Sequence, residues 1–136
     1  MYLIHLTEME KHYFLDLAYG VIEQSQGLSS KDKALLNEYC KELHIDADRC
    51  NIELGKSHEK LESVLTKFTR VAARRIVYLE IIGLFLSDGH YSDHEQLIAK
   101  EMREHFELTD EVAEELFNVA KGFMDTFRKG ADLISA

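Results

Sequence analysis

Carboxylate and imidazole side chains gather near a short turn in the middle of the chain. Asp88, His90 and Glu95 lie within eight residues of one another, and Glu80 precedes them by two helical turns. Oxygen ligands alone suit calcium or magnesium, and an added imidazole nitrogen favours zinc or a transition metal. We therefore name Asp88, Glu95, Glu80 and His90 as candidate ligands of a divalent metal ion. The competing interpretation is structural: Asp88 stabilises the turn, Glu95 caps a helix, and the histidines are solvated.

Half of a calcium-binding loop is present at this turn. In the EF-hand pattern, Asp88, Gly89 and Glu95 would occupy the fifth, sixth and twelfth positions. The first and third positions would then be Leu84 and Leu86, whose side chains cannot coordinate a hard cation. A standard EF-hand is therefore excluded, and a turn of the form Asp-Gly-x-apolar-Ser-x-x-Glu remains.

Catalysis has little support in the sequence. The chain lacks the Gly-x-Ser-x-Gly, P-loop, His-Glu-x-x-His and Cys-x-x-Cys patterns. Cys40 and His44 are four residues apart, but no third group is evident to orient the histidine. Two hypotheses follow: a non-catalytic binding or scaffold module, and, as the alternative, a metal-dependent enzyme that uses the acidic turn with an open coordination position.

The elements around the turn are predicted to form a helical hairpin. Residues 76–86 are all apolar or glycine except Glu80, which predicts a helix buried on most of its surface. Gly89 can adopt the positive φ that ends a helix. Ser92 and Glu95 have the spacing of a capping box, so a second helix starts there.

The rest of the chain also shows helical periodicity. A capping box of Thr7 and Glu10 predicts a helix from Glu8 to about residue 24, and a second helix runs from residue 29 or 30 to about 44. A third is expected from 57 to 68, with its continuation into the central helix left open. Thr109 caps the last helix, which we expect to fray after Gly130.

A weak internal repeat relates residues 14–46 to residues 78–109. Asp16 aligns with Glu80, and each is an acid within an apolar stretch. A buried carboxylate needs a partner, for which Arg74, Arg75 and Arg103 are candidates. If the repeat is a duplication, two αα-hairpins pack around a pseudo-twofold axis, and the chain forms one domain over residues 1–136.

The turn with Asp88, Gly89, Ser92 and Glu95, within two related hairpins, resembles the TerB-like family of tellurite-resistance-associated proteins. The likeness covers residues 8–130 in layout; in the first repeat Gln26-Gly27-Leu28-Ser29 replaces the acidic turn. The resemblance implies an all-α compact bundle of about seven helices, a cytoplasmic non-catalytic protein, a link to stress response or resistance, and acidic positions that bind divalent metal.

Composition narrows the classes of partner. The 136 residues carry a formal net charge of −9, which argues against binding nucleic acid through its phosphates. No segment is long enough to cross a membrane, and no signal peptide is visible. Cys40 and Cys50 show no disulfide-framework spacing, so a reducing cytoplasm is expected. A protein partner is expected but not identified, and Phe127 and Leu133 on the last helix are candidates for a homodimer interface.

Overall fold

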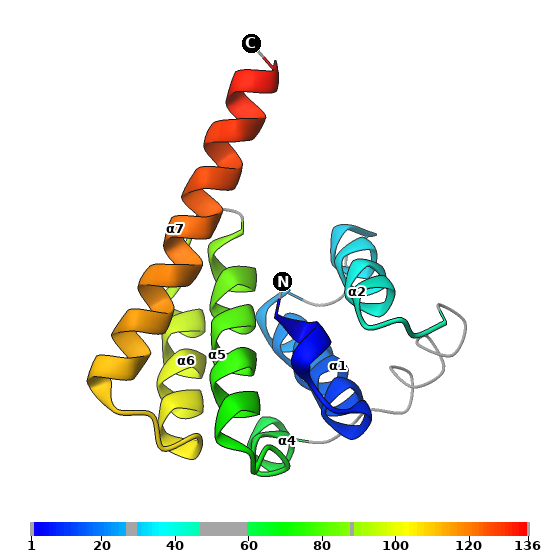
Figure 1. The fold of residues 1–136 in the computed structure, drawn as a ribbon, viewed down its shortest axis with the longest axis vertical. Coiled ribbons are helices and arrows are strands. Elements are labelled where there is room, and N and C mark those ends of the chain that lie inside the picture. Colours follow the sequence, from blue (N-terminus) through cyan, green and yellow to red (C-terminus); the bar gives the residue numbers. More distant parts are fainter. Residues whose placement is uncertain (1, 27–29, 47–59, 88, 136) are drawn as a thin grey trace. The chain divides into compact units, whose positions relative to one another are not determined.

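A computed structural model describes residues 2–26, 30–46, 60–87 and 89–135, without the side chains of residues 25, 26, 30–33 and 35. Over these ranges the protein contains six α-helices, one 3-10 helix and no β-strand (Figure 1), which confirms the all-α prediction. None of the helices described there is both long and apolar enough to span a bilayer. The elements are the 3-10 helix Leu3–His5, α1 (Glu8–Gln26), α2 (Ser30–Glu42), α4 (Leu61–Leu65), α5 (Val71–Leu86), α6 (Asp93–His105) and α7 (Asp110–Ser135).

The chain divides into two compact units, Met1–Arg74 and Arg75–Ala136. We describe each unit by itself. The organisation of residues 1–136 as a single domain stays a prediction.

In the first unit, α1 packs against both α2 and α4. Its buried side chains include Phe14, which meets Tyr39 of α2 edge to face at a centroid distance of 5.2 Å. Phe68, which follows α4, is also buried and meets the Tyr13 ring of α1 edge to face at 6.1 Å. Aromatic contacts thus join α1 to both of its neighbours, which adds directional packing to the apolar burial.

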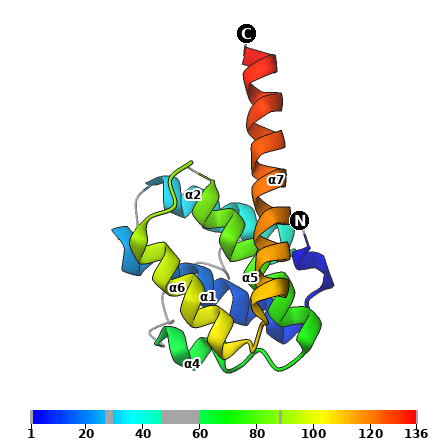
Figure 2. The same ribbon diagram turned by 90° about the vertical axis from the view of Figure 1, so that its left-hand side faces the viewer.

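In the second unit, α5 and α6 run antiparallel and α7 returns alongside them (Figures 1 and 2). The last turns of α7 extend beyond the ends of α5 and α6 in both views. Large apolar side chains of α5 and α6 are buried in the part of this unit that the structure describes: Val77, Ile81, Ile82, Phe85, Ile98 and Met102. The apolar segment around Glu80 is therefore a buried helix, as its composition predicts.

The two predicted capping boxes and the predicted glycine cap at the end of α5 are confirmed. At the start of α1 the Thr7 amide donates to Glu10 Oε1 at 2.8 Å, and the Glu10 amide donates to Thr7 Oγ1 at 3.3 Å. At the start of α6 the Ser92 amide donates to Glu95 Oε1 at 2.9 Å, and the Glu95 amide donates to Ser92 Oγ at 3.1 Å. Gly89 has φ +81°, the left-handed conformation predicted for the end of α5.

The third helix is much shorter than predicted. Helix α4 covers only Leu61–Leu65, and α5 begins separately at Val71; the predicted start at Ser57 lies outside the described residues. Two side chains satisfy the carbonyls at the break: the Thr66 hydroxyl donates to the Ser63 carbonyl at 2.7 Å, and Arg74 Nε donates to the Phe68 carbonyl at 2.7 Å. These contacts replace the helical hydrogen bonds that continuation would supply.

The expected fraying after Gly130 is wrong, because α7 continues to Ser135. A single glycine inside a helix costs only about 1 kcal/mol relative to alanine. Pro is absent from the whole chain, so no residue after Gly130 forces the helix to stop.

The two repeated segments share their burial pattern and the way their second helices end. Residues 14–18 and 78–82 both have four buried positions around one half-buried acid. After α2, His44 has φ +58° and the Ile45 amide donates to the Cys40 carbonyl; after α6, Glu107 has φ +55° and the Leu108 amide donates to the Arg103 carbonyl. Both ends are Schellman turns at equivalent positions.

Candidate functional site

The four predicted metal ligands lie in different local settings. Glu80 is half-buried on α5, His90 is exposed, and Glu95 completes the capping box of α6. Asp88 lies outside the described residues. Within the described part of the chain, no three His, Cys, Asp or Glu side chains gather closely enough to hold a metal ion. A site that includes Asp88 stays a prediction.

An arginine that the sequence did not single out lies against the Asp-Gly turn. Arg128 of α7 donates a hydrogen bond to the Leu86 carbonyl at the end of α5, and its guanidinium nitrogen is 3.7 Å from where a Cβ on Gly89 would be. Asp125 lies 3.5 Å from the same guanidinium. A fixed positive charge beside the turn stabilises the negative end of the α5 dipole and repels a cation placed there.

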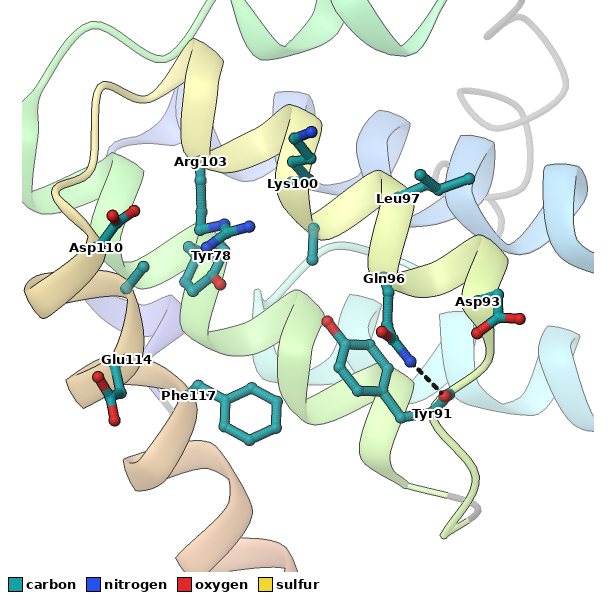
Figure 3. Close-up of a pocket in the computed structure, with 12 residues that line it drawn as sticks. Tyr78, Tyr91, Asp93, Gln96, Leu97, Lys100, Arg103, Asp110, Glu114 and Phe117 are labelled. Carbon is teal, nitrogen blue, oxygen red and sulfur yellow. Dashed lines mark hydrogen bonds between the residues drawn. The ribbon is translucent and has the colours of Figure 1, made fainter.

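The second unit carries a groove of about 690 Å³ between α5, α6 and α7 (Figure 3). Both tyrosines of this unit line it, together with basic, acidic and apolar side chains from α6 and α7. The residues used below are Tyr78, Tyr91, Lys100, Arg103, Phe117, Asp93, Asp110 and Glu114.

One wall of the groove is aromatic. Tyr91 stacks on Phe85 with ring centroids 6.2 Å apart and planes 23° apart. Tyr91 also meets Phe117 of α7, with ring centroids 5.7 Å apart and planes tilted by 33°. This row joins the segment before α6 to α5 and α7, and the aromatic contacts fix the direction of the Tyr91 hydroxyl.

Two hydroxyl groups lie close to one guanidinium group. Figure 3 shows the Tyr91 hydroxyl directed toward Tyr78 and Arg103. Burial raises the pKa of Tyr91 to about 12, with a smaller contribution from Tyr78, while the positive charge of Arg103 acts in the opposite direction. Burial also raises the pKa of Tyr78, again opposed by Arg103. Both phenols therefore remain protonated at neutral pH and can donate hydrogen bonds.

Arg103 was considered from sequence as a partner for Asp16 or Glu80. Both acids are half-buried, and each has a polar interaction of its own. The side chain of Arg103, by contrast, forms no hydrogen bond or ion pair with any other residue that the structure describes. Helical periodicity places Arg103 on α6, but only the packing of α5 and α7 puts it beside two tyrosines.

The most buried charged group in the described part of the chain was also missed as a site. Glu10 is 8% exposed, and Arg70 donates to its two carboxylate oxygens at 2.7 and 3.2 Å. The hydrogen bond from Arg70 lowers the pKa of Glu10 against the effect of burial. Arg70 also donates to the His5 carbonyl at 3.1 Å. This cluster ties the chain before α5 to the start of α1, which is a structural role.

Cys40 has no free thiol, since it is disulfide-bonded and buried. It therefore cannot act as a nucleophile with His44. Cys50 lies outside the described residues.

Comparisons of the chain with protein-family models, with curated proteins and with solved structures find no match.

Proposed function

We propose that this protein is a non-catalytic helical binding module, and that the exposed apolar face of α7 binds a second copy of the chain. The observation that carries the proposal is a row of exposed large side chains on this face, which we name the α7 stripe: Val119, Phe123, Phe127 and Ile134. Their spacings of four, four and seven residues place them on one side of a helix.

The exposure of the α7 stripe is large for a helix of a soluble protein. Phe127 is 64% exposed and Ile134 is 87% exposed, and Leu133 beside the stripe is 71% exposed. The sequence named Phe127 and Leu133 as candidates for a dimer interface, and both are exposed. Contiguous exposed apolar surface of this kind is rare on monomeric proteins and marks interaction sites.

A second copy fits the stripe because the stripe carries no charge. Lys121 and Asp125 form an ion pair with each other at 2.8 Å, and Arg128 is held by Leu86 and Asp125. Helical spacing puts these charged side chains on the opposite side of α7 from Phe123. Two antiparallel copies of α7 can therefore bury both stripes without desolvating a charge.

The size of the stripe sets the expected affinity. Its exposed side chains supply roughly 500 Å² of apolar surface per copy, against roughly 800 Å² per partner in a standard interface. We therefore expect a dimer that dissociates on dilution.

Sedimentation of the full chain over a wide range of concentration tests the proposal. The wild-type protein should shift from monomer to dimer, and Phe127→Glu should remain monomeric throughout. Ile4→Glu is the matched control, because Ile4 is 60% exposed but lies in the first unit. A wild-type protein that is monomeric at every concentration, or a control that dissociates equally, contradicts the proposal.

The TerB-like resemblance remains part of this proposal. What supports it is the pair of equivalent hairpins with matching Schellman turns and the Asp-Gly turn closed by Gly89. A link to stress response comes from the resemblance alone, whereas a cation at the Asp88 turn is also predicted from the acids and the histidine around that turn. Metal analysis of the purified protein, with calorimetry on the wild type and on Asp88→Ala, tests the cation directly.

A further inference from the structure

The groove of the second unit presents side-chain donors that make no hydrogen bond within the described part of the chain. Tyr78 is only 4% exposed, and its hydroxyl makes no hydrogen bond within the described part of the chain. No fully buried side-chain oxygen or nitrogen described there lacks a partner. The Tyr78 hydroxyl is therefore open to the groove that its side chain lines.

Two further donors are directed to the same place. Arg103 and Tyr91 line the groove with Tyr78, and Arg103 is close enough to both tyrosines to act on their ionisation (Figure 3). A guanidinium group has five N–H donors and no acceptor, and a protonated phenol donates one hydrogen bond. The chemistry that satisfies all three groups is an anionic oxygen acceptor.

The remaining charged lining residues restrict the kind of anion. Three exposed acids, Asp93, Asp110 and Glu114, outnumber one exposed lysine, Lys100, at the groove. Their excess negative charge opposes a dianion such as phosphate more strongly than a monoanion. Asp93 and Asp110 already occupy the first turns of α6 and α7, where the helix dipole stabilises them without Arg103.

The aromatic wall indicates what the anion is attached to. The rings of Tyr91 and Phe117 are 5.7 Å apart and tilted by 33°, so they form an apolar surface next to the donors. A planar carboxylate matches the fork of the guanidinium group, and an apolar or aromatic body can lie against the rings.

We propose that this groove binds a monoanionic carboxylate that bears an aromatic or other apolar group. Arg103 pairs with the carboxylate, Tyr78 and Tyr91 donate hydrogen bonds to it, and Phe117 contacts the apolar group. The site is distinct from the α7 stripe and does not depend on dimer formation.

Benzoate is the probe, titrated into the full-length protein and followed by amide chemical shifts in two-dimensional NMR. Benzamide has the same ring without the charge, and inorganic phosphate has the charge without the ring. We expect saturable shifts from benzoate around Tyr91, Arg103 and Phe117, and weaker binding of both other probes.

Two variants assign the donors. Arg103→Gln should weaken benzoate binding by about tenfold, and Tyr91→Phe, which keeps the stacked ring, by about fivefold. Arg75→Gln is the matched control: Arg75 is an exposed arginine of α5 that does not line the groove, so its loss should leave the affinity unchanged.

Three results would overturn the proposal. The first is the absence of saturable shifts with benzoate. The second is benzamide or phosphate binding as tightly as benzoate, which would indicate an apolar or a general anion site. The third is an equal loss of affinity in Arg103→Gln and Arg75→Gln. Tyr91→Phe keeps the test decisive if Arg103→Gln does not fold.

Discussion

The hairpins α1–α2 and α5–α6 share a backbone pattern but differ in the chemistry that they carry. At equivalent positions the first has Phe14 and Cys40, and the second has Tyr78 and Arg103. Phe14 is fully buried and Cys40 is disulfide-bonded, so both are closed to solvent. Tyr78 adds a hydroxyl and Arg103 a guanidinium to a groove. The two hairpins thus share a backbone pattern, and polar side chains at two equivalent positions turn a closed core into a candidate binding site.

The two capping boxes differ in a similar way. Glu10 and Glu95 make the same two backbone contacts at the starts of α1 and α6. Glu10 additionally binds Arg70, sixty positions along the chain, and is buried. The same local motif therefore caps a helix in both units, and in the first unit its glutamate also forms a tertiary ion pair.

The largest expected effect comes from removing the ion pair between Glu10 and Arg70. Glutamine can still complete a capping box, so Glu10→Gln removes chiefly the charged contact with Arg70. We expect it to lower the free energy of unfolding by about 2 kcal/mol, and Glu95→Gln by less than about 0.5 kcal/mol. Chemical denaturation of the full chain measures both. Equal losses in the two variants would show that the Arg70 contact contributes nothing.

Acidification should remove the same contact in the wild-type protein. The pKa of Glu10 is lowered in the folded state from its ordinary value of 4.5, so its contribution to stability is fully present above pH 4.5. This contribution is lost as the pH falls through the lowered pKa that Glu10 has in the folded state. Thermal unfolding should show that the stability gap between wild type and Glu10→Gln narrows over this range. A gap independent of pH would exclude the ionised pair as its cause.

A further variant, with a smaller effect than Glu10→Gln, tests the capping box of the second hairpin alone. Ser92→Ala removes the hydroxyl that accepts from the Glu95 amide and should cost about 1 kcal/mol. Ser87→Ala is the control, because its exposed hydroxyl donates only to the Leu84 carbonyl. The measurement is again chemical denaturation. If Ser87→Ala lowers the free energy of unfolding as much as Ser92→Ala, the capping hydrogen bond of Ser92 contributes no additional stability.

The sequence by itself determined the helices and most of their ends. Apolar periodicity fixed the class of fold, and the pairs Thr7–Glu10 and Ser92–Glu95 fixed two helix starts, because a capping box needs only four consecutive residues. Gly89 likewise marked the end of α5 through its own backbone freedom. These signals act over a few residues, so they can be recognised without knowledge of the rest of the chain.

Only the tertiary structure decided which polar groups from distant parts of the chain lie together. The partners Glu10 and Arg70, Leu86 and Arg128, and Tyr78 and Arg103 are each separated by at least twenty residues. Their encounters depend on how helices pack, and helical periodicity only assigns each side chain to a face of its own helix. Sequence reasoning therefore placed the candidate site at a turn, where acids are adjacent along the chain, while packing formed a groove of donors elsewhere in the same unit.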